Sequence, residues 1–156
     1  PRYAALGVIP GTQGIFACSD GPWVLDRLGA KRTKERGYIF RSMAESGALI
    51  MNGTDPPVEE ISPIASFHCS ITRKLPDGSI FQPEQRLTRE QALRSYTINN
   101  AYAAFEEDIK GSITPGKLAD ITVLSKDIMT VPEEDIPGTE IVYTIIGGEV
   151  KYKWSR

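Results

Sequence analysis

One aspartate lies at a position that suits a catalytic or metal-binding carboxylate. Asp55 follows the apolar run 48–51 and a short Asn-Gly-Thr turn, and two prolines come directly after it. The prolines restrict the chain beyond Asp55, and such preorganisation suits a catalytic carboxylate that binds a metal or transfers a proton. An aspartate after a strand is also common as a turn former or a helix N-cap, so position alone leaves both roles open.

Other candidate side chains lie near the same predicted rim. Gln13 lies just after the first predicted strand, as Asp55 lies just after the second. Parallel α/β units place their working groups at the carboxyl ends of strands. Gln13 is therefore a candidate for substrate binding. Trp23 and Arg27, in the stretch SDGPWVLDRLG, are further candidates because they could line a pocket. Equally, Trp23 could pin this stretch to the core.

Side chains of the types that bind metals are otherwise scarce. His68 is the single histidine, and metal hydrolases need several His, Asp or Glu ligands. We interpret it as a helix residue that is packed or partly exposed, and Cys69 as a small core residue rather than a nucleophile. Cys18 and Cys69 lie far apart in sequence and make neither a disulfide framework nor a zinc motif, so a reduced, cytoplasmic setting is expected.

The first half of the chain predicts elements that bring these positions together. Residues 4–12 are typical of a buried strand, and a long loop with apolar and aromatic side chains follows over 13–29. Helical spacing predicts a helix over 33–46, and the run 48–54 predicts a second strand. A strand, helix and strand in this order form a βαβ unit, which implies a parallel sheet.

Two further helices are predicted in the middle of the chain. The segment 62–74 begins with a serine N-cap that is followed by proline, a favoured residue at the first helical position. The segment 87–108 opens on a capping box, Thr88 to Gln91, and we expect it to break near residues 99–100.

The pattern changes to β-rich sequence near the end of the chain. A strand is predicted over 119–124, and two β-rich runs joined by Gly147-Gly148 are typical of a hairpin. The predicted fold class is therefore α/β, with a strand–helix domain over 1–110 and a β-rich segment over 111–156.

Composition limits the classes of partner. The chain has 156 residues, 40% of them hydrophobic and 24% charged, with a net charge of −2, values that are ordinary for a soluble globular protein. A weakly acidic chain is not expected to bind nucleic acid or an anionic membrane. No apolar run approaches the roughly 18 residues that span a membrane.

Three stretches carry a resemblance to a known family. GTDPPVE, residues 53–59, resembles the Gly-Ser-Asp-x-Pro-Val stretch that ends the eighth barrel strand in the amidohydrolase superfamily. Residues 83–127 resemble that superfamily's C-terminal signature, a helix pair followed by Gly-Ser-Ile-x-Pro-Gly-Lys-x-Ala-Asp. GVIPGTQ and SDGPWVLDRLG look like the subgroup that contains N-substituted formamide deformylase.

The resemblance implies a fold and a chemistry. Members use a metal-bearing TIM barrel and a β-sandwich that is built from both chain ends, and a metal activates the water that attacks an amide-like carbon. This chain would supply the last two βα units of the barrel and the C-terminal strands of the sandwich. By position, Asp55 would be the aspartate that binds the metal, with zinc as the expected metal, and that transfers the proton of the attacking water. The parent enzyme would hydrolyse a non-peptide C–N bond of a small-molecule substrate.

The sequence departs from the family pattern in two ways. A TIM barrel needs about 200 residues or more, and the family's His-x-His pair, bridging lysine and later histidines are absent from this sequence. Phe16 stands where the subgroup often has a histidine, which weakens any metal or substrate role for that loop position.

These departures lead to expectations about the isolated chain. We expect it to hold no catalytic metal, to be inactive alone, and to pair with the missing N-terminal part of the enzyme or self-associate, since two parallel strands leave open edges. The alternative is a non-catalytic module, derived from this fold, that binds a partner or forms an oligomer.

Overall fold

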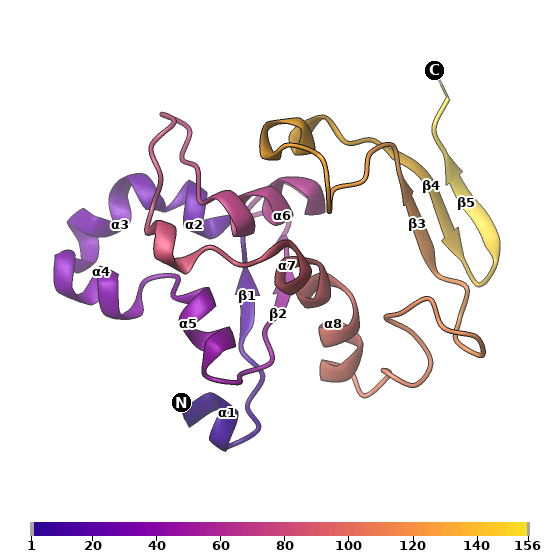
Figure 1. Ribbon diagram of the computed structural model, residues 1–156, viewed down its shortest axis with the longest axis horizontal. Helices are drawn as coiled ribbons and strands as arrows, with labels where there is room; N and C mark the ends of the chain where they lie inside the picture. Colours follow the sequence, from indigo (N-terminus) through magenta and orange to yellow (C-terminus); the bar gives the residue numbers. More distant parts are fainter. Residues whose placement is uncertain (1, 156) are drawn as a thin grey trace. The chain divides into compact units, whose positions relative to one another are not determined.

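A computed structural model describes residues 2–155 and divides the chain into two units, one that ends at Tyr96 and one that begins at Thr97 (Figure 1). The first is mainly helical around two short strands, and the second carries an antiparallel sheet. The fold is therefore mixed α/β, as predicted. The assignment of residues 1–110 to a barrel and of 111–156 to a sandwich stays a prediction.

Two parallel strands form the centre of the first unit. Strand β1 (Gly11–Gln13) pairs with β2 (Met51–Gly53), in a register that places Thr12 opposite Asn52 (Figure 1). This pairing confirms the predicted βαβ unit.

The prediction of a strand over 4–12 is wrong for most of its length. A short helix, α1 (Arg2–Ala5), occupies its start, and Gly7 follows the helix with a φ of 64°, in the left-handed conformation that commonly ends helices. Pro10, which comes just before β1, has no amide hydrogen with which to extend the strand ladder. The second strand, predicted over 48–54, is likewise shortened to β2.

The prediction of a long loop over 13–29 is also wrong. This stretch folds into helices α2 (Phe16–Ser19) and α3 (Gly21–Leu28). Pro22 lies in the first turn of α3, where its fixed φ suits a helix, and the amides of Trp23 and Val24 donate to the Asp20 carbonyl. A proline that suggests a loop by composition therefore starts a helix here.

The helix predicted over 33–46 is divided into two. Helix α4 (Ala30–Arg36) and helix α5 (Phe40–Glu45) are separated by three residues, and within that break Tyr38 has a φ of 51°. A non-glycine residue in this left-handed region cannot continue a right-handed helix.

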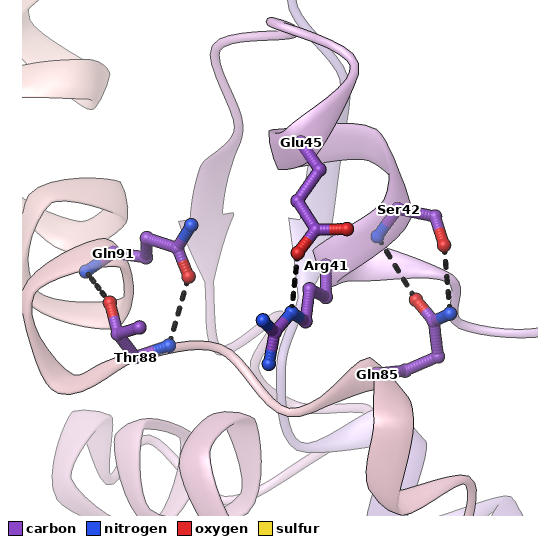
Figure 2. Close-up of polar contacts among 6 residues, drawn as sticks. All are labelled: Arg41, Ser42, Glu45, Gln85, Thr88 and Gln91. Carbon is purple, nitrogen blue, oxygen red and sulfur yellow. Dashed lines mark hydrogen bonds and ion pairs between the residues drawn. The ribbon is translucent and has the colours of Figure 1, made fainter.

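The helices that follow β2 begin as predicted. Helix α6 (Pro63–Thr72) is capped by Ser62, whose hydroxyl accepts a hydrogen bond from the Ala65 amide at 3.3 Å. Helix α7 (Arg89–Tyr96) follows the predicted capping box: the Thr88 amide donates to Gln91 Oε1 at 2.9 Å, and the Gln91 amide donates to Thr88 Oγ1 at 3.1 Å (Figure 2).

A buried amide side chain fastens α5 to the segment that follows α6. Gln85 closes the short 3-10 helix η1 (Pro83–Gln85) and bonds Ser42 twice (Figure 2). Gln85 Oε1 accepts from the Ser42 amide at 3.1 Å, and Gln85 Nε2 donates to Ser42 Oγ at 2.8 Å. Nearby, Gln82 Nε2 donates to the Gly37 carbonyl at 2.8 Å. The Pro-Glu-Gln part of the signature stretch therefore serves packing.

A buried arginine holds the same region from the other side. Arg73, the C-cap of α6, is fully buried, and its guanidinium lies 5.3 Å from the ring centres of both Phe40 and Phe81. Its Nε donates to the Phe81 carbonyl at 3.1 Å. Burial lowers the pKa of Arg73 to about 10 while Glu84 raises it, so the side chain remains a cation at neutral pH.

The core of the first unit is formed by small, aliphatic and aromatic side chains. They include Ala17, Val24, Phe40, Ile50, Phe67, Ile71, Leu87 and Ala92. Within residues 2–155, no helix has both the length and the apolar character needed to cross a membrane.

The second unit starts with a short helix and ends in a three-stranded sheet. Helix α8 (Ile98–Ala103) begins directly after Thr97, so the predicted break falls slightly earlier than residues 99–100. Strands β3 (Ile121–Leu124), β4 (Ile141–Ile146) and β5 (Glu149–Lys153) pair antiparallel in that order. The 3-10 helix η2 (Glu133–Gly138) precedes β4.

The predicted hairpin is confirmed. Gly147 and Gly148, both with positive φ, join β4 to β5, and Asp120 Oδ1 accepts a hydrogen bond from the Gly147 amide at 2.8 Å. The aspartate of the signature motif thus supports the hairpin turn.

The Gln85 contact can be tested by truncation. We expect Gln85→Ala to lower the free energy of unfolding by about 2 kcal/mol, because it leaves the Ser42 amide without its acceptor. Gln91→Ala is the matched control: it removes an exposed capping contact and should cost about 0.5 kcal/mol. Urea denaturation measures both, and equal losses would contradict the role given to Gln85.

Candidate functional site at the strand ends

Asp55 lies on a tight turn just beyond the carboxyl end of β2. Its φ is 56°, and its carbonyl accepts hydrogen bonds from the amides of Val58 at 2.9 Å and Glu59 at 3.3 Å. Its side chain is exposed, and in the described part of the chain the carboxylate makes no hydrogen bond or ion pair. The backbone of Asp55 is therefore held while its carboxylate is available to a ligand.

The carboxyl end of β1 is fixed by a side chain from β2. Asn52 is 5% exposed, and its Oδ1 accepts a hydrogen bond from the Gly14 amide at 2.8 Å. Its Nδ2 donates to Ser70 Oγ on α6 at 3.4 Å, and Ser70 Oγ donates to the Ser66 carbonyl at 2.8 Å. Asn52 thus joins both strand ends to one helix.

A second set of polar contacts reaches the same place through α6 and α7. The Ile15 amide donates to Ser66 Oγ at 3.0 Å, and Tyr96 Oη donates to the Gly53 carbonyl at 3.2 Å. Burial raises the pKa of Tyr96, and the Ser66 contact opposes that rise.

Gly14 lies where backbone and side chains approach closely. A Cβ atom at this position would lie 2.1 Å from Ser70 Oγ and 2.9 Å from the Ser66 carbonyl oxygen. The chain leaving β1 can therefore contact α6 only because residue 14 has no side chain.

Cys18 and Cys69 form a disulfide between α2 and α6, with their Cα atoms 6.1 Å apart. The prediction that these cysteines do not pair is wrong. Their separation of 51 residues in sequence hides the fact that α2 follows β1 and α6 follows β2. Helices that follow adjacent parallel strands lie close together, whatever the chain length between them.

The predicted substrate residues lie in two places. Gln13 lines a cavity of about 580 Å³ together with Thr12, Phe16, Tyr38 and other residues of the first unit. Trp23 and Arg27 lie one turn apart on α3, outside the lining of that cavity. Trp23 is 47% exposed.

The beginning of α3 is linked to the break between α4 and α5. The Tyr38 hydroxyl donates a hydrogen bond to Asp20 Oδ2. Burial and the Asp20 carboxylate both raise the pKa of Tyr38, which keeps the phenol protonated as the donor.

The buried polar residues Asn52, Ser66 and Tyr96 were not among the predicted site residues. A signal for one of them existed, because Asn52 interrupts an apolar strand. Ser66 and Tyr96 look like ordinary helix residues, and nothing in their spacing indicates that they meet.

The described residues do not by themselves form a cluster of metal ligands. Across residues 2–155, no three His, Cys, Asp or Glu side chains are grouped so that they could hold a metal ion. The exposed carboxylate of Asp55 has the chemistry of a single ligand for a divalent cation.

Comparison with known proteins identifies a family. The model described as "Amidohydrolase family" matches residues 1–152, nearly the whole chain. The chain is 31% identical over 157 residues to "Putative amidohydrolase YtcJ" of Bacillus subtilis, covering 99% of this chain and 30% of that protein. It is 29% identical over 116 residues to N-substituted formamide deformylase of Arthrobacter pascens, covering 74% of this chain and 21% of that enzyme.

Solved structures agree with these relatives. An uncharacterized metal-dependent hydrolase from Pyrococcus horikoshii matches with a TM-score of 0.74 at 28% identity, covering 85% of this chain and 27% of that one. The chain thus spans less than a third of the length of these relatives.

The contact at Gly14 predicts a sharp difference between two glycines. Gly14→Ala should lower the free energy of unfolding by about 1–3 kcal/mol, because its methyl group would overlap Ser70 and Ser66. Gly53→Ala, at the end of β2, has no atom within 4 Å of the added Cβ and should change stability by less than about 1 kcal/mol. Thermal or urea unfolding compares them, and equal stability would contradict the close packing.

The disulfide predicts a clear chemical result. Under non-reducing conditions, iodoacetamide should label neither cysteine of the unfolded chain, and after reduction it should label both, as read by intact mass. The double variant Cys18→Ser, Cys69→Ser should be less stable than the oxidised protein by about 2–4 kcal/mol. Two labelled thiols in the air-oxidised, unreduced protein would show that the bond does not form.

Proposed function

Because the chain belongs to the amidohydrolase family, we propose that it is a segment of a longer metal-dependent hydrolase that cleaves a non-peptide C–N bond, with Asp55 as its catalytic carboxylate. One observation carries the proposal. An exposed carboxylate without a partner in the described residues stands at the carboxyl end of β2, next to the end of a parallel neighbour. Working groups of parallel α/β units lie at this end.

The proposed role of Asp55 has two parts. The carboxylate would contribute one ligand to a divalent metal, for which zinc is our first candidate, and it would accept the proton of the attacking water and pass it to the leaving nitrogen. When bound, the metal supplies a lowered pKa for that water and polarisation of the carbonyl. The turn at Asp55 suits both roles because its backbone is fixed while its oxygens are free.

The substrate would be a small amide or formamide. The printed name of one relative, N-substituted formamide deformylase, supports this class. Gln13 lies at the end of β1 beside the cavity and is our first candidate for hydrogen bonding to substrate. Trp23 and Arg27, which share one face of α3, are candidates for contacts farther from the reacting bond.

The rest of the active site would come from outside this segment. Among the described residues, β1 and β2 pair only with each other, so each has one free edge. Further parallel strands at these edges would extend the sheet toward a TIM barrel, and strands added to β3–β5 would complete a sandwich. The N-terminal part of the enzyme is the partner that we propose for both.

A non-catalytic interaction module is the second candidate. Several large apolar side chains of the second unit are open to solvent, including Phe105, which is 93% exposed, and Ile113, which is 85% exposed. Such side chains are typical of surfaces that another chain covers. The two candidate functions differ in the role of Asp55, which is catalytic only in the hydrolase.

Replacement of Asp55 tests the enzyme. In the longer protein, Asp55→Asn should lower turnover by at least about a hundredfold to ten-thousandfold, because an amide cannot accept the proton and is a weaker ligand. The melting temperature of the metal-loaded protein should change little, since the carboxylate has no partner in the described residues. Steady-state kinetics against N-formyl amines, with differential scanning fluorimetry, measure the two effects.

Asp120→Asn is the matched control. It weakens the acceptor of the Gly147 amide in the β4–β5 turn, so it should affect stability more than turnover. Wild-type turnover in Asp55→Asn would show that Asp55 is only a turn residue. Lack of turnover in the unmodified longer protein loaded with metal would instead favour the interaction module.

A further inference from the structure

We infer that Tyr96 is a positioning residue for Asp55, because its hydroxyl holds the backbone at the end of β2, from which the turn at Asp55 begins. The inference rests on the proposed function for its catalytic meaning, although the hydrogen bond stands on its own. Tyr96 Oη on α7 donates to the Gly53 carbonyl at 3.2 Å.

The direction of this bond follows from the groups involved. The Gly53 carbonyl can only accept, so the Tyr96 hydroxyl donates to it. Ser66 lies beside the Tyr96 hydroxyl, and Ser66 Oγ accepts from the Ile15 amide at 3.0 Å, just after the end of β1.

Partial burial makes this hydrogen bond costly to lose. Tyr96 and Gly53 are both half-buried, so without the hydroxyl the Gly53 carbonyl would lose its hydrogen-bond donor where water has limited access. The raised pKa of Tyr96 keeps its phenol protonated through the neutral range, so its donor is present wherever the enzyme would work.

The hydrogen bond from Tyr96 to Gly53 lies next to the proposed catalytic group. Gly53, whose carbonyl receives the Tyr96 hydrogen bond, comes two residues before Asp55, and the amides of Val58 and Glu59 hold Asp55 from the other side. The carboxylate has no side-chain partner among the described residues, so its position depends on these backbone contacts. Tyr96 supplies the contact on the strand side.

The hydrogen bond from Tyr96 to Gly53 is separate from the contacts that join the two strands. Asn52 links both strand ends to Ser70 without using Tyr96, and the disulfide links α2 to α6. Removal of the Tyr96 hydroxyl alone should therefore leave the fold in place and loosen mainly the turn at Asp55.

The first test uses this chain itself. In Tyr96→Phe, which keeps the ring, we expect amide exchange at Val58 and Glu59 to become about fivefold faster by NMR, since one hydrogen bond is lost. Tyr102→Phe, at an exposed tyrosine of α8, is the matched control and should leave both rates unchanged. Unchanged exchange at Val58 and Glu59 in Tyr96→Phe would overturn the positioning role.

The second test separates positioning from general stability. In the longer protein, Tyr96→Phe should lower kcat about ten- to a hundredfold with little change in KM, because small displacements of a catalytic group are costly. A loss of stability alone would instead lower the amount of active enzyme and leave kcat per folded molecule unchanged.

Failure of this inference is distinguishable from failure of the proposed function. Loss of turnover in Asp55→Asn together with wild-type kcat in Tyr96→Phe would reject positioning and keep the catalytic aspartate. Wild-type turnover in Asp55→Asn would reject the proposed function, while the exchange rates at Val58 and Glu59 would still decide whether Tyr96 orders the turn.

Discussion

The side-chain amide of Asn52 is the contact on which the first unit depends. The backbone ladder between β1 and β2 has only three residue pairs, and it stops where the chain must leave both strands for α2 and α6. At that point, the Asn52 side chain hydrogen-bonds to the Gly14 amide and to Ser70 on α6. A side chain therefore connects the two strands where the backbone pairing ends. The disulfide between α2 and α6 and the close contact of Gly14 with Ser66 and Ser70 lie in the same place as this amide.

The return from β1 to β2 is stabilised by polar side chains in buried places. Its four helices are short, and short helices need tertiary contacts to persist. Gln85 bonds α5, Gln82 bonds the carbonyl of Gly37 before it, and the Arg73 cation lies against Phe40. These contacts tie α5 and the break before it to the segment that follows α6.

The sequence indicated the elements that depend on local rules. The Ser62 cap, the capping box at Thr88 and the glycine turn of the hairpin were predicted, because each is set by residues within a few positions. The pairing of Cys18 with Cys69 was not, because it depends on two distant helices lying side by side. Composition also misled where Pro22 starts a helix rather than a loop, since proline suits both.

The same division applies to the site. Asp55 is visible in the sequence because a carboxylate between a strand and two prolines has few roles, whereas Tyr96 is an ordinary helix residue until the fold brings it to Gly53. The backbone of Asp55 then adds an argument that residue types could not supply. A non-glycine residue at positive φ costs about 1–3 kcal/mol and persists only when its surroundings enforce it. The bonds to Gly53 on one side and from Val58 and Glu59 on the other enforce it here. Tyr38, Arg73, Gln82 and Phe105 also have positive φ, so this conformation alone does not mark a catalytic residue. Asp55 differs from them because it combines an exposed carboxylate with a turn that is held from both sides.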